Sequence, residues 1–140
     1  MTPAALVILA LAAFPAPAPD SLDFRTPALM SAPTRLYIDL DEGAVWCGKG
    51  QGPGPAAGEI RVTAQAVLPP ATAQRLRVLA DAALARNFES QPSRPPAPDS
   101  GLFVKAANRG VRFEGAVFWP TPEAQALIDA AYAARPAACR

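Results

Sequence analysis

The segment from Arg35 to Cys47 constrains the fold more than any other part of this sequence. Its first half alternates apolar and polar side chains, which is typical of a strand with one face in a core. The apolar positions are Leu36, Ile38 and Leu40. Acidic residues and Gly43 then interrupt the alternation, and glycine readily adopts the positive φ of a tight turn. The sequence therefore predicts a β-hairpin whose second strand carries Trp46 and Cys47.

Two registers of this hairpin fit the pattern. A two-residue loop pairs Leu40 with Val45, whereas a three-residue loop turns Val45 and Cys47 outward. A slip of one residue exchanges the two faces of a strand, so the first register is expected because it keeps Val45 and Cys47 on the apolar face. It places Trp46 on the other face, opposite Asp39.

The remaining segments predict an α+β fold. Residues 59–68, 102–107 and 111–117 alternate like strands. Residues 72–86 and a segment starting at Thr121 carry apolar side chains at helical spacing. The order is β-β-β-α-β-β-α, and we expect an antiparallel sheet of about five strands with two helices packed on one face.

Residues 102–107 and 111–117 form a second predicted hairpin, and the pattern of their side chains indicates its register. Pairing Ala106 with Phe113 keeps the apolar face together and sets Lys105 opposite Glu114, an opposite-charge cross-strand pair. A two-residue loop at Arg109-Gly110 and a four-residue loop give the same faces, so both remain open.

The amino terminus resembles an export signal. Residues 4–14 form an uninterrupted apolar run that is too short to cross a membrane, and Ala16-Pro17-Ala18 offers a small-x-small cleavage pattern. We expect a signal peptide at 1–18, a Pro/Ala-rich linker at 19–34 and a single domain at 35–140. The protein would then be periplasmic or secreted, without a stable membrane span.

The two cysteines, Cys47 and Cys139, form an even pair in a chain that resembles an exported protein. Disulfides persist in oxidising compartments, so the sequence predicts a bond between them. The pair is not a CxxC motif, which favours a structural role over a redox role.

Composition excludes several kinds of chemistry. The chain has no histidine and a net charge of +1, so histidine-based catalysis, a structural zinc site and nucleic-acid binding are not expected. Residues 48–58 are rich in glycine but lack the Gly-Lys-Ser/Thr ending of a phosphate loop. Residues 39–43 resemble the start of a calcium loop, but Ala44 occupies the position of its obligatory glycine. We therefore expect no cofactor and no bound metal.

The leading hypothesis is a non-enzymatic module that binds a protein or envelope component through the polar sheet face and the Gly-rich loop. The expected partner-binding residues are Tyr37 and Trp46, because aromatic residues dominate binding hot spots, together with Lys49 in the Gly-rich loop. The alternative is a small-ligand-binding protein or an enzyme that uses polar residues of the same face. Its candidate residues are Asp39, Lys105 and Glu114.

Overall fold

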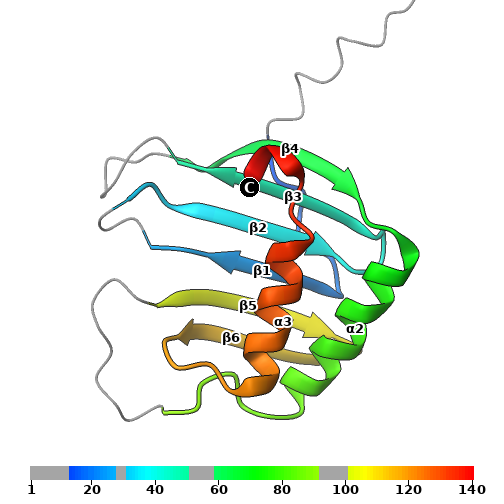
Figure 1. Cartoon of the computed structure of the whole chain (residues 1–140), viewed down its shortest axis with the longest axis vertical. Helices are drawn as coiled ribbons and strands as arrows, with labels where there is room; N and C mark the ends of the chain where they lie inside the picture. The colour runs from blue at the N-terminus through cyan, green and yellow to red at the C-terminus, as the bar shows by residue number, and fades with distance from the viewer. Residues whose placement is uncertain (1–12, 28–30, 51–58, 92–100) are drawn as a thin grey trace, which may run out of the picture.

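The computed structural model describes residues 13–27, 31–50, 59–91 and 101–140. In these ranges, six strands form one antiparallel sheet in the order β4-β3-β2-β1-β5-β6 (Figure 1). The strands are β1 Ser21–Arg25, β2 Thr34–Asp39, β3 Ala44–Lys49, β4 Arg61–Val67, β5 Leu102–Asn108 and β6 Val111–Val117. Helices α2 Pro70–Leu84 and α3 Pro122–Ala133 lie on one face of the sheet, and the short 3-10 helix η3 Ala137–Cys139 follows α3 (Figure 1). The predicted α+β fold is confirmed, with six strands in place of about five.

The additional strand is β1, which lies in the range expected to be a linker. It pairs with β2 on one side and with β5 on the other, so it holds the centre of the sheet. Leu22 and Phe24 are fully buried. The linker expectation is wrong for these residues because β1 supplies pairing partners for strands that would otherwise expose unpaired backbone edges.

The first hairpin differs from the expected register by two residues. Ile38 pairs with Val45, and Asp39 pairs with Ala44, so the loop has four residues. The Asp39 carboxylate accepts hydrogen bonds of 2.9 Å from the backbone N–H groups of Asp41 and Glu42, which stabilises this longer turn. A shift of two residues preserves the faces, but the partner of Trp46 is Tyr37 rather than Asp39.

The second hairpin has the expected register. Ala106 pairs with Phe113 and Lys105 pairs with Glu114. The loop is the two-residue alternative, with φ of 53° at Arg109 and 82° at Gly110. Positive φ at both central residues matches the right-handed twist of the flanking strands.

The helices begin and end close to their predicted limits. Thr121 caps α3 by accepting a 3.3 Å hydrogen bond from the backbone N–H of Ala124, and Pro122 stands in the first turn. The Tyr132 ring of α3 packs against Phe24 of β1, with ring centroids 5.9 Å apart. The core therefore lies between the sheet and the helices. Its largest fully buried aliphatic side chains are Leu22, Leu36, Ile38, Leu76, Leu127, Val45 and Val104.

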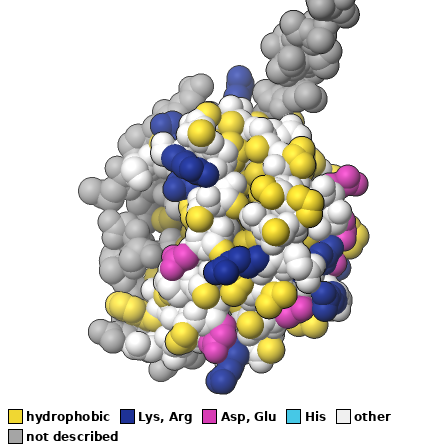
Figure 2. All heavy atoms as spheres, turned by 45° about the vertical axis from the view of Figure 1, so that its right-hand side comes forward, with side chains coloured by type: hydrophobic (Ala, Val, Ile, Leu, Met, Phe, Trp, Pro, Cys, Tyr) yellow, Lys and Arg dark blue, Asp and Glu magenta, His cyan; other side chains and the backbone are white. Residues whose placement is uncertain are grey.

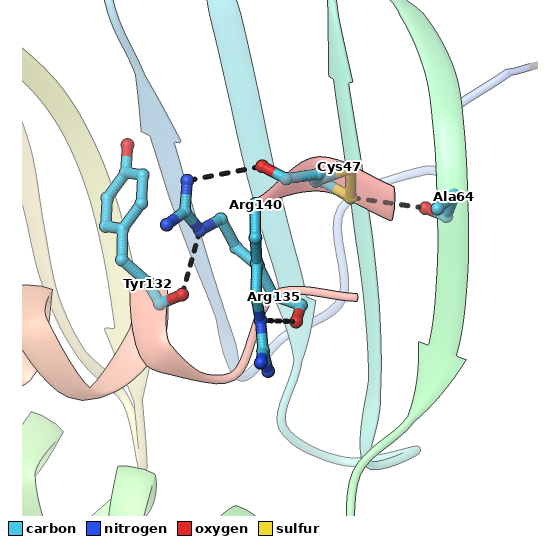
Figure 3. The surroundings of a disulfide bond; sticks show 6 residues. Cys47, Ala64, Tyr132, Arg135 and Arg140 are labelled. Carbon is cyan, nitrogen blue, oxygen red and sulfur yellow. Dashed lines mark hydrogen bonds between the residues drawn. A yellow bond between two sulfur atoms is a disulfide. The ribbon is translucent and has the colours of Figure 1, made fainter. Parts of the chain in front are cut away.

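The predicted disulfide between Cys47 and Cys139 is present and joins β3 to the carboxyl-terminal tail (Figure 3). The two Cα atoms are 6.4 Å apart, although the residues are separated by 92 positions in the sequence. Arg135 donates to the carbonyl oxygens of Tyr132 at 2.9 Å and Cys139 at 3.3 Å. The tail is thus fixed both by the covalent bond and by its own arginine.

Glu89 connects the segment after α2 to the segment before α3. Its carboxylate accepts hydrogen bonds from the backbone N–H groups of Phe118 at 2.6 Å and Trp119 at 3.0 Å. Burial alone would raise the pKa of Glu89, but the backbone donors of Phe118, Trp119, Gln91 and Ser90 outweigh it and hold the pKa below its ordinary value.

We expect Glu89→Gln to lower the free energy of unfolding by about 2–3 kcal/mol near pH 7, because the amide would turn N–H groups toward backbone donors. Since the folded pKa is lowered, the stabilisation is complete above the ordinary pKa of 4.5 and is lost as the pH falls through the folded pKa. Urea unfolding of both proteins from neutral pH to about pH 3 should show the difference shrinking in acid. A difference that stays constant with pH would contradict this account.

Two sequence-based expectations fall largely outside the described residues. They are the apolar run at 4–14 and the Gly-rich loop at 48–58. Within the described ranges, neither helix is long and apolar enough to cross a membrane.

Candidate functional site

The sheet face opposite the helices, here called the open face, carries most of the polar strand residues. The side chains on it alternate with those that enter the core, so their positions follow from strand geometry. They include Asp23, Arg35, Tyr37, Trp46, Arg61, Lys105, Arg112 and Glu114.

Residues 13–19, which precede β1, run across this open face, behind the sheet in the view of Figure 1. The backbone N–H of Ala18 donates a 2.7 Å hydrogen bond to the Tyr37 hydroxyl. The Arg35 guanidinium lies 4.3 Å from the centroid of the Phe14 ring. Tyr37 is only 1% exposed. Part of the open face is therefore covered by the chain itself.

A buried carboxylate lies in the middle of the open face. Asp23 is 5% exposed and accepts two hydrogen bonds from Arg35, at 2.9 and 3.0 Å. Arg25 forms a second ion pair with it at 3.2 Å. Because a two-pronged arginine–carboxylate pair fixes the guanidinium plane, Asp23 holds Arg35 in place against Phe14.

A hollow of about 440 Å³ opens beside this ion-pair cluster. Its walls come from β1, β2, β5, β6 and residues 17–19. Lys105, Arg112 and Glu114 line it, and none of the three forms an ion pair with another described residue. Lys105 and Glu114 lie opposite each other on β5 and β6. In contrast to Asp23, however, none of the three side chains is held in an ion pair with a described residue, so each can turn toward a ligand.

The expected partner-binding residues are only partly brought together. Tyr37 and Trp46 pack against each other with ring centroids 5.7 Å apart. Tyr37 is covered by residues 13–19, whereas Trp46 is half-buried. Lys49 lies elsewhere and lines a separate hollow of about 160 Å³ next to the disulfide.

Of the alternative set, Lys105 and Glu114 line the same hollow, but Asp39 does not. Asp39 is used instead to hold the turn of the first hairpin. Sequence reasoning missed Asp23 and Arg35. A signal existed for Asp23, because a charged residue between Leu22 and Phe24 marks the polar face of an alternating strand.

Arg77 of α2 belongs to a second cluster of charged and polar side chains. It pairs with Asp20 at 2.8 Å and with Asp41 at 2.9 Å, and it donates to the buried Asn108 at 2.7 Å. The hydrogen bond from Arg77 lowers the pKa of Asp20 more than burial raises it. The cluster therefore ties α2 to the two hairpins, with one guanidinium shared between two carboxylates.

Other parts of the molecule give weaker candidates. On the side turned forward in Figure 2, apolar side chains are interspersed with basic and acidic ones, so charge does not single out that side. In the described ranges, no three His, Cys, Asp or Glu side chains gather as a metal site would require. Comparisons with protein-family models, with curated proteins and with solved structures found no match to this chain.

Proposed function

We propose that this chain is an exported, non-enzymatic module that binds a protein or envelope component through the open face of its sheet. One observation supports this proposal most directly. Lys105, Arg112 and Glu114 line a hollow on the face opposite the two described helices, and none of the three forms an ion pair with a described residue. Binding surfaces need polar groups that are free to exchange water for a partner.

Export to the periplasm or beyond is supported by two features. The apolar run at 4–14 is followed by the small-x-small pattern at 16–18. The disulfide between Cys47 and Cys139 is of a kind that persists in oxidising compartments.

A second candidate function is the binding of a small ligand on the same face. The hollow of about 440 Å³ is comparable with ligand pockets, which measure about 300–1,000 Å³. A small zwitterionic molecule would suit the mixed charges of Lys105 and Glu114.

The test compares a Lys105→Ala/Arg112→Ala double variant with the matched control Arg75→Ala, an exposed arginine on α2. The wild type and Arg75→Ala should recover similar amounts of a partner cross-linked from envelope extract. The amount recovered with the double variant should be about tenfold lower. Equal recovery by all three proteins would contradict the proposal. A small molecule retained by the wild type and lost from the double variant in native mass spectrometry would favour the second candidate.

A further inference from the structure

Residues 13–19 have an unusual composition for a segment that lies on a sheet. Prolines at 15, 17 and 19 alternate with small residues, and proline has no backbone N–H. Such a segment can lie extended on a protein surface without joining the strand ladder, since few of its donors need partners. Ala18 provides one of these few donors. Its N–H donates to the Tyr37 hydroxyl at 2.7 Å, and its carbonyl accepts from the Ser21 hydroxyl at 3.1 Å.

Two positions of β2 hold this segment. Arg35 stacks on the Phe14 ring with 4.3 Å to its centroid, and Tyr37 accepts the Ala18 N–H. These two residues are two positions apart, so they project from the same face of β2. The proline-alternating segment thus contacts two side chains of β2, here called the fixed points: Arg35 holds an aromatic ring, and Tyr37 holds a backbone amide.

Both fixed points are held in place by neighbours that do not belong to the segment. Asp23 binds Arg35 through two hydrogen bonds, and Trp46 packs against the Tyr37 ring. A site with ordered side chains and a ligand that is already extended loses little conformational entropy on binding. Aromatic-lined surfaces of this kind are how proline-rich peptides are recognised.

We propose that the open face over β1 and β2 is a binding site for an extended proline-rich segment of another protein, and that residues 14–18 occupy this site in cis. The ligand carries an aromatic residue four positions before the amide that reaches Tyr37, as Phe14 precedes Ala18. Removal of the leader after Ala18 uncovers Arg35 and Tyr37. This inference rests on the proposed function and specifies the chemical class of the partner.

The test uses the full chain and a labelled synthetic peptide with the sequence of residues 13–19, with binding followed by fluorescence anisotropy. In the full chain the cis segment competes with the peptide. Phe14→Ala removes the ring stacked under Arg35, so the variant should bind the peptide about tenfold more tightly than the wild type does. A peptide with alanine in place of its phenylalanine is the matched control and should lose this gain.

A second comparison adds Tyr37→Phe to the Phe14→Ala chain. It removes the hydroxyl acceptor and keeps the ring, so affinity for the peptide should fall about three- to tenfold. Near-ultraviolet circular dichroism checks that each variant is folded, and Phe14 itself belongs to none of the six strands. Equal affinity of wild type and Phe14→Ala, or no preference for the phenylalanine peptide, would overturn the inference. Such a result would leave the proposed function standing if partner capture still depended on Lys105 and Arg112.

Discussion

Reduction of the disulfide between Cys47 and Cys139 is expected to lower the free energy of unfolding by about 4–5 kcal/mol, the largest effect we expect from any single change. The bond joins residues 92 positions apart, so its loss restores a large amount of chain entropy to the unfolded state. Small domains are stable by only about 5–15 kcal/mol in total, so the reduced protein should be close to its unfolding threshold. Urea unfolding with and without a thiol reductant measures the difference.

Cys139→Ser provides the matched variant for this experiment. Cys139 is half-buried in the tail, whereas Cys47 is 3% exposed, so changing Cys139 leaves the packing of β3 intact. The variant should unfold at the same urea concentration as the reduced wild type, and the reductant should not change it further. A wild type that loses less than about 1 kcal/mol on reduction would show that the bond does little to restrict the unfolded chain.

The sequence predicted those features of the fold that depend on local pattern. Alternating apolar residues defined the faces of β2, β3, β5 and β6, and the cap at Thr121 located the start of α3. An error of two residues in register leaves each side chain on its predicted face of the sheet, because side chains alternate between the two faces with a period of two residues. The exact pairing of the first hairpin was wrong because Asp39 accepts bonds from its own turn, a contact that hydrophobic pattern does not report.

The position of β1 could not be predicted in the same way. Leu22 and Phe24 do alternate with polar residues, but β1 has only five residues and lies between Pro19 and Pro27. Its place between β2 and β5 depends on pairing with residues far along the chain, which no local signal specifies.

The same omission explains what was missed in the candidate site. Asp23 belongs to β1, so its ion pair with Arg35 was not foreseen. The sequence predicts that Tyr37 binds a partner and that residues 1–18 are a leader outside the folded domain. Instead, Phe14 and Ala18 lie over the face that Tyr37 shares with Arg35. Tyr37 is therefore covered for as long as residues 14–18 remain attached to the domain.

Phe24→Ala is expected to lower the free energy of unfolding by about 3–5 kcal/mol, because it leaves a cavity where a large ring was fully enclosed. Phe24 is 0% exposed, lies between Leu36 and Val104 in the sheet and packs against Tyr132 of α3. The substitution would remove core contacts toward β2 on one side of β1 and toward β5 on the other.

The matched control is Phe103→Ala on the neighbouring strand β5, where the ring is 39% exposed on the open face. The control should cost about 1 kcal/mol or less, since most of the cost of removing a ring comes from the buried contacts that it loses. Thermal or urea unfolding compares the two variants with the wild type. If Phe24→Ala cost no more than Phe103→Ala, residues 21–25 would behave as the linker first expected from their composition. β1 could then not be the strand that holds the two hairpins in one sheet, and the fixed positions of Asp23 and Arg35 on the open face would lose their support.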